Sequence, residues 1–209
     1  MKIELEQVLP QEIETRSFEL IEQELPHPLD PAIAPIIKRV IHTSADFDYA
    51  DTLCFSEDAL TSALAALKAG ATIVTDTNMA LAGINKPALK KLGCIACCFM
   101  ADADVAAAAK ENGTTRATAA VDKAAALTGP VVFAVGNAPT ALVRMCELIE
   151  SGQLDPALII GVPVGFVNVV QAKELIMQTD VPYIVARGRK GGSNVAAAIV
   201  NALLYQLTR

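Results

Sequence analysis

Residues 131–161, VVFAVGNAPTALVRMCELIESGQLDPALIIG, contain the clearest structural signal in the chain. Two continuous apolar runs, VVFAV (131–135) and ALIIG (157–161), enclose a segment that reads as a helix from about Pro139 to Ile149. Continuous apolar runs, unlike alternating ones, are typical of strands that are covered on both faces. A strand, a helix and a second strand in this order predict a right-handed βαβ unit in a parallel sheet.

The same alternation continues along the chain in both directions. Further strands are predicted at ATIVTD (71–76), CIACCFM (94–100) and PYIVA (182–186). Helices are predicted from Ser56 to Gly70, in the Ala-rich stretch that ends near Gly113, from about Thr115 to Gly129, from about Val167 to Met177 and from about Ser193 to Leu207. This pattern predicts a three-layer α/β/α fold with a mainly parallel, doubly wound sheet.

The first 55 residues differ from the rest because no strand is evident in them. An amphipathic helix is predicted over residues 13–24, and Pro26 ends it. Asp30 and Pro31 form a good N-cap and first helical residue for a second helix that runs to about His42. The chain is therefore predicted to be a single domain, 1–209, made of a helical arm (1–55) and an α/β core (56–209).

Composition excludes several classes of protein. The 209 residues are 53% hydrophobic and 19% charged, with a formal net charge of −6. Such a chain is not intrinsically disordered, and its acidic balance argues against nucleic-acid binding. No apolar run approaches the roughly 20 residues of a membrane-spanning helix. The start, MKIELEQVLPQEIE, is too acidic for a signal peptide. We therefore expect a cytoplasmic protein with no membrane contact.

The cysteines do not indicate a metal site. Cys94 and Cys97 form a CxxC pair, but no second pair or histidine follows at zinc spacing. All five cysteines are expected to be free thiols. Asp46, Asp48 and Asp51 lack the glycine and distal glutamate of a calcium loop, so a solvated acidic turn is expected there.

Candidate binding groups follow four of the predicted strands. In open parallel sheets, ligands bind outside the carboxyl ends of the strands. Hydroxyl, amide and glycine residues are concentrated in the loops TDTNM (75–79), GNAPT (136–140), VPVGF (162–166) and RGRKGGSN (187–194). This distribution predicts one ligand that spans the sheet edge.

The loop RGRKGGSN (187–194) carries three cations and three glycines just before a helix. Backbone N–H groups, the helix dipole and the side-chain charges there all favour an anion. A solvated basic turn is the alternative. The chain lacks both the GxxxxGK[ST] loop and a GxGxxG after a strand, so a nucleotide site is not expected.

Two isolated residues carry weaker signals. His42 falls at the end of a predicted helix, where a positive charge is favoured, and could act as a general acid or merely as a capping residue. Arg116 opens a predicted helix, where a cation opposes the dipole, and this hints at an anionic partner.

Together these motifs resemble those of the precorrin-8X methylmutases, including the cobalt-precorrin-8 methylmutases of the anaerobic cobalamin route. The resemblance covers nearly the whole chain. The motifs that carry it are Ile13-x-x-x-Ser17-Phe18, Arg39-Val40-Ile41-His42, TDTNMALAGI (75–84), Thr115-Arg116-Ala117, VGNAPTAL (135–142), GVPVGFV (161–167) and RGRKGGS (187–193). The chain departs from the family at Gln171-Ala172-Lys173, where Glu-Ser-Lys is more usual, which leaves Lys173 as the expected feature there.

The resemblance implies an isomerase that moves a methyl group from C11 to C12 of a corrinoid polycarboxylate, giving hydrogenobyrinate or its cobalt form, cobyrinate. It implies a homodimer with active sites near the subunit interface, and no cofactor. His42 matches the family's active-site histidine, which would protonate a ring nitrogen. Ser17 and Arg39 match positions associated with substrate.

The physical interpretation of the residues agrees with this resemblance. A flat polyanionic ligand needs cations along one edge and an apolar floor, for which Met79, Val164 and Phe166 are candidates. The residues predicted to bind substrate are Ser17, Arg16, Arg39, Thr43, Thr77, Arg116, Asn137, Arg187, Arg189 and Lys190. Two alternatives remain open at this point: a non-catalytic carrier of corrinoids or tetrapyrroles, and a different α/β enzyme such as a small-molecule phosphotransferase.

Overall fold

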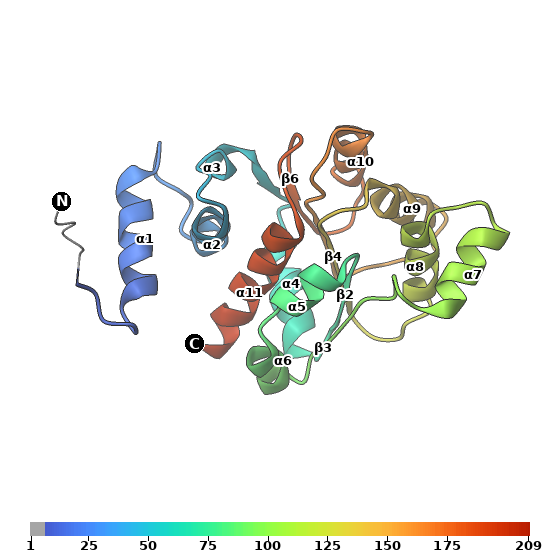
Figure 1. Ribbon diagram of the computed structural model, residues 1–209, viewed down its shortest axis with the longest axis horizontal. Helices are drawn as coiled ribbons and strands as arrows, with labels where there is room; N and C mark the ends of the chain where they lie inside the picture. Colours follow the sequence, from blue (N-terminus) through green and yellow to red (C-terminus); the bar gives the residue numbers. More distant parts are fainter. Residues whose placement is uncertain (1–6) are drawn as a thin grey trace, which may run out of the picture.

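The computed structural model describes residues 7–209 (Figure 1). Residues 1–6, where the predicted arm and the acidic start begin, lie outside the described part. The helices are α1 (Ile13–Glu24), α2 (Ala34–Ser44), α3 (Tyr49–Thr52), α4 (Ala59–Lys68), α5 (Asn78–Gly83), α6 (Lys86–Leu92), α7 (Ala103–Glu111), α8 (Arg116–Ala125), α9 (Pro139–Glu150), α10 (Val169–Ile176) and α11 (Ser193–Thr208). The strands are β1 (Leu53–Phe55), β2 (Thr72–Thr75), β3 (Ile95–Cys97), β4 (Val131–Val135), β5 (Leu158–Gly161) and β6 (Tyr183–Ala186).

The strands form one six-stranded sheet in the order β1-β6-β5-β4-β2-β3. All neighbours are parallel except β1, which pairs antiparallel with β6. The mainly parallel α/β fold predicted from the apolar runs is therefore confirmed. Within residues 7–209, no helix has the length and apolar character needed to cross a bilayer.

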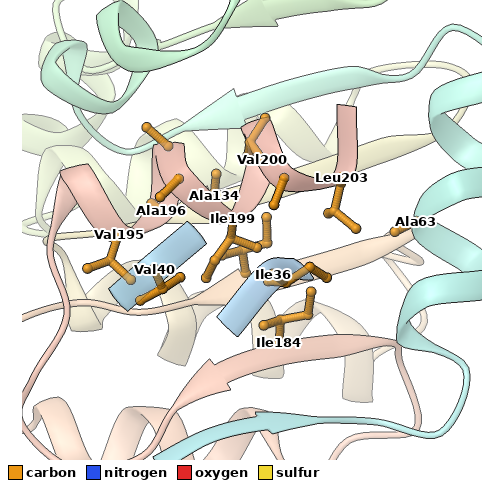
Figure 2. Close-up of a cluster of buried hydrophobic side chains, with 14 of the residues drawn as sticks. Ile36, Val40, Ala63, Ala134, Ile184, Val195, Ala196, Ile199, Val200 and Leu203 are labelled. Atoms are coloured by element: carbon orange, nitrogen blue, oxygen red, sulfur yellow. The ribbon is translucent and has the colours of Figure 1, made fainter. Parts of the chain in front are cut away.

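The strands are apolar on both faces because each face has its own layer of helices. In β4, Val132 and Ala134 belong to a core shared with α2, α4 and α11. Phe133 and Val135, which point the other way, belong to a core shared with α8, α9 and α10. Figure 2 shows the first core, where side chains of α2 and α11 meet over the sheet. The continuous apolar runs are thus explained by burial on two sides.

The prediction that residues 1–55 contain no strand is wrong, because β1 lies there. Leu53 pairs with Ala186 and Phe55 with Ile184, so β1 extends the sheet at its edge. A three-residue strand is too short to show either an apolar run or an alternation. The second helix also begins later than predicted, at Ala34. The Asp30 carboxylate instead accepts a hydrogen bond from the N–H of Ala32, inside a turn that precedes α2.

Short helices also occupy residues 77–93, for which the pattern predicts none. Side-chain caps define them, since Thr77 accepts a hydrogen bond from the N–H of Ala80 and Asn85 accepts one from the N–H of Ala88. Capping of this kind supplies acceptors for N–H groups that a helix leaves without partners.

Helix α1 packs loosely. Only Ile21 of this helix is buried, while Ile13 is 53% and Leu20 39% exposed. In Figure 1, α1 stands at the edge of the molecule and α2 lies between it and α11. The predicted arm therefore has apolar side chains that its own chain does not cover.

The sheet has a topological switch point between β2 and β4. From β2 the chain passes to β3 on one side, whereas β4 pairs with the other side of β2. The helices after β2, α5 and α6, pack with α11 on one face, whereas α9, which follows β4, covers the opposite face. Such a switch point opens a crevice at the carboxyl ends of the two strands.

Candidate active site

A buried carboxylate joins the two loops at the switch point. Asp76 follows β2, and its oxygens accept hydrogen bonds from the N–H groups of Gly136, Asn137 and Ala138 at 2.8, 2.7 and 2.7 Å. Burial raises the pKa of Asp76, and the three N–H bonds oppose that rise. Asp76 thereby fixes the loop after β4 against the end of β2.

The N-terminus of α11 joins this crevice. The hydroxyl oxygens of Thr77 and Ser193 lie 2.7 Å apart, which ties the loop after β2 to the first residue of α11. Gly136 permits the approach, since a Cβ there would lie 2.7 Å from the Cα of Ser193. Asn137 is exposed beside this contact.

Helix α8 brings Arg116 to the same edge. The hydroxyls of Thr115 and Thr140 lie 3.0 Å apart, and they link the start of α8 to the loop after β4. Arg116 is exposed at the first position of α8. We call this edge, formed by residues 76–79, 115–116, 136–140, 162–168 and 187–194, the strand-end rim.

The loop after β6 completes the strand-end rim and packs tightly on the loop after β5. Gly191 has φ 155°, and a Cβ there would lie 2.1 Å from the carbonyl oxygen of Val162. The N–H of Gly192 donates to that same oxygen at 2.9 Å. The guanidinium of Arg189 lies 5.5 Å from the ring centroid of Phe166.

Apolar side chains face solvent along the strand-end rim. Met79 is 71% exposed, Phe166 82% and Val164 48%. Large apolar side chains that face solvent along one edge are a feature of binding surfaces. These three residues are the ones predicted to form an apolar floor, and the structure places each of them on this edge.

The predicted cations of the strand-end rim differ in what they contact. Arg187 pairs with Glu174 at 3.2 Å, and Lys190 pairs with Asp46 at 2.7 Å and Asp48 at 2.6 Å. The hydrogen bonds to Asp46 and Asp48 raise the pKa of Lys190. For Arg116 and Arg189, the structure of residues 7–209 records no carboxylate partner.

His42 belongs to a second group of residues. It is exposed on the last turn of α2, next to exposed Thr43, and its ring meets the ring of Phe18 edge-on at 5.5 Å. The guanidinium of Arg39, one turn earlier on α2, lies 4.7 Å from the same Phe18 ring. We call Glu14, Ser17, Phe18, Arg39 and His42 the arm cluster.

Arg39 is fully engaged within the arm cluster. It donates two hydrogen bonds to Glu14, at 2.9 and 3.1 Å, and lies 5.1 Å from the Tyr205 ring. These hydrogen bonds are the largest contribution that holds the pKa of Glu14 down at about 2, and Arg209 adds to it. Beside them, α1, α2 and the end of α11 enclose a groove of about 570 Å³.

Within one chain, the His42 end of the arm cluster lies near the strand-end rim, whereas Arg39 lies against Tyr205, away from the rim. Ser193 and Tyr205 are at opposite ends of α11, about 18 Å apart along the helix axis.

Arg16 and Ser17 lie on α1, where Arg16 pairs with Glu19 and the Ser17 hydroxyl donates to the carbonyl of Ile13 at 2.8 Å. The Lys190 ion pairs to Asp46 and Asp48 connect the rim with the segment just after α2, so the end of α2 lies beside the rim.

Sequence reasoning missed the internal supports of the rim. The sequence places Asp76 in the loop TDTNM (75–79) and Lys173 in the motif Gln171-Ala172-Lys173, but it does not indicate that either side chain holds other loops in place. Lys173 is fully buried and donates to the carbonyl oxygens of Gly188 and Lys190, both at 2.8 Å. The signals in the sequence that point to Lys173 are its place among apolar residues of a predicted helix and its match to the lysine of the family motif.

Comparison with known proteins gives a consistent result. A family model described as precorrin-8X methylmutase matches residues 12–206. The chain is 47% identical to a cobalt-precorrin-8 methylmutase of Salmonella typhimurium, over 95% of this chain and 96% of that protein. It is 43% identical to a protein of the same name from Priestia megaterium, over 94% and 88%. A crystal structure of a precorrin-8X methylmutase from Thermus thermophilus superposes with a TM-score of 0.86 at 39% identity, covering 94% of this chain and 98% of that one.

Proposed function

This chain belongs to the precorrin-8X methylmutase family, and from this premise we propose how its two clusters handle the substrate. The protein is an isomerase of cobalamin biosynthesis that moves a methyl group from C11 to C12 of precorrin-8X or cobalt-precorrin-8. The observation that carries this conclusion is the sequence identity to named methylmutases over nearly the whole chain.

The strand-end rim binds the carboxylate side arms of the macrocycle. Arg116 and Arg189 supply positive charge, because no acidic partner is recorded for either within residues 7–209.

Thr77 and Asn137 supply hydrogen bonds at the switch point, where Asp76 fixes their loops. Met79, Val164 and Phe166 supply exposed apolar surface to one face of the ring system.

His42 is the general acid. Its imidazolium donates a proton to a ring nitrogen, which draws electron density from the conjugated system and eases the sigmatropic shift of the methyl group. The proton returns to His42 when the rearranged ring system is complete, so substrate and product have the same atoms. Exposure of His42, together with its contact to Phe18, supports access of a flat ligand to this position.

The active enzyme is a homodimer in the cytoplasm. Helix α1 leaves Ile13 and Leu20 exposed, and a second copy of the chain would cover such a surface. In a dimer of this kind the arm residues, including Arg16, Ser17, Arg39 and Thr43, border the substrate together with the rim. Arg187 and Lys190 shape the rim through their ion pairs, in which carboxylates balance their charge.

A turnover assay tests this function. The purified protein is incubated with precorrin-8X or its cobalt form, and the visible absorption spectrum is followed, since formation of the corrin changes the chromophore. We expect conversion at a rate that depends on enzyme concentration. Tight binding of the corrinoid without conversion would contradict the enzymatic function and would instead indicate a carrier.

A further inference from the structure

Lys173 is the most deeply buried charged residue in the described part of the chain. Its side chain has no exposed surface, and it projects from α10. Burial lowers its pKa to about 8. A buried ammonium is costly unless its hydrogen bonds are satisfied, and a methionine of similar shape would avoid that cost. Its presence therefore calls for an explanation from its contacts.

The contacts of Lys173 are confined to one loop. Its Nζ donates to the carbonyl oxygens of Gly188 and Lys190, each at 2.8 Å. These two residues stand on either side of Arg189. Over residues 7–209 no carboxylate partner of this ammonium is recorded, so its charge is compensated by peptide dipoles alone.

Other anchors act on the same short segment. The N–H of Gly165 donates to the carbonyl of Arg189 at 3.2 Å, and the guanidinium of Arg189 lies over the Phe166 ring. Glu174, the neighbour of Lys173, pairs with Arg187. Helix α10 and the loop before it thus bind the carbonyl groups of residues 188–190 and the side chain of Arg187, while the Arg189 side chain stays exposed.

We propose that Lys173 is a positioning residue of the active site, whose buried ammonium holds the backbone on both sides of Arg189 and so directs that guanidinium toward a carboxylate of the substrate. This rests on the function proposed above. Lys173 does not touch the substrate. It restricts the conformations of a glycine-rich loop in the free protein. The entropic cost of ordering this loop when the substrate binds is therefore smaller.

A double-mutant cycle with Arg189 tests the proposal. Product affinity is measured by absorbance titration at fixed salt for wild type, Lys173→Met, Arg189→Ala and the double variant. We expect Lys173→Met to weaken binding about tenfold, the usual size of a hydrogen bond to a charged group. In the Arg189→Ala background the same change should weaken binding less than about twofold, because the group it positions is gone.

Additional measurements separate positioning from general loss of structure. Lys173→Met should raise KM about tenfold and leave kcat within about threefold, because His42 lies on another helix. Lys68→Met, a change of an exposed lysine at the end of α4, is the matched control and should alter neither constant. Circular dichroism verifies that each variant is folded.

Three outcomes would overturn the proposal: unchanged affinity of Lys173→Met, equal loss of affinity in both backgrounds, or a fall in kcat as large as the rise in KM. If Lys173→Met does not fold, Lys173→Gln takes its place in the cycle, and failure of both to fold would make Lys173 a folding residue only. Absence of binding by the wild-type protein would contradict the proposed substrate site instead, so the two failures are distinguishable.

Discussion

The strand-end rim and the arm cluster both contain arginines, but the two regions use them differently. In the arm cluster, Arg39 is bound by Glu14 and lies against two aromatic rings. In the rim, buried Asp76 and Lys173 hold the loops, and the Arg189 side chain is exposed with its guanidinium near the Phe166 ring. From this comparison we propose that Arg189, rather than Arg39, is the arginine available to a ligand, because no carboxylate within residues 7–209 pairs with it.

The largest effect is expected for His42→Ala, which tests whether the arm cluster has a chemical function at all. Removing a general acid typically lowers the rate about 10²- to 10⁴-fold. We expect that loss in kcat, with product affinity within about twofold of wild type because the rim is intact. The assay is the spectral turnover assay, and His27→Ala is the matched control, since His27 is exposed and pairs with Asp51. Near-normal turnover by His42→Ala would refute the acid role.

A smaller effect is expected from the arginines, and it compares the two regions directly. Arg189→Ala and Arg116→Ala should each weaken product binding about tenfold, the usual size of one charge-assisted contact. Arg39→Ala should change product affinity less but lower the thermal stability, since it removes a bidentate ion pair and two ring contacts. Titrations at one salt concentration and thermal unfolding measure both. An affinity loss from Arg39→Ala larger than that from Arg189→Ala would reverse the assignment.

The smallest effect concerns the pH dependence of the arm. The pKa of Glu14 is lowered from 4.5 to about 2 in the folded protein, so its ion pair stabilises the fold above pH 4.5, and this contribution is lost as the pH falls toward 2. Because Glu14 is 38% exposed, solvent screening limits the effect to about 0.5 kcal/mol. Urea unfolding of Glu14→Gln and wild type should differ at neutral pH and converge on acidification. A difference that grows at low pH would be inconsistent with this ion pair.

Sequence periodicity predicted the central sheet and α1 well, because burial on one or two faces leaves a local pattern. The loops of the strand-end rim were also predicted, since parallel strands bring their carboxyl ends to one edge. Contacts between distant residues were not predicted: Lys190 with Asp46 and Asp48, Lys173 with the carbonyls beside Arg189, and Glu14 with Arg39. Each depends on how elements far apart in the chain pack, and no local pattern specifies that.

Asp76 also limits which ligands the crevice can bind. In many open α/β sheets, the peptide N–H groups where a strand passes into a helix bind the phosphate of a nucleotide. Here the corresponding groups of residues 136–138 are already occupied by an internal carboxylate. A phosphate at that point would find these three N–H groups already engaged. The protein thus carries its own carboxyl group at the position where a nucleotide-binding α/β fold holds a phosphate.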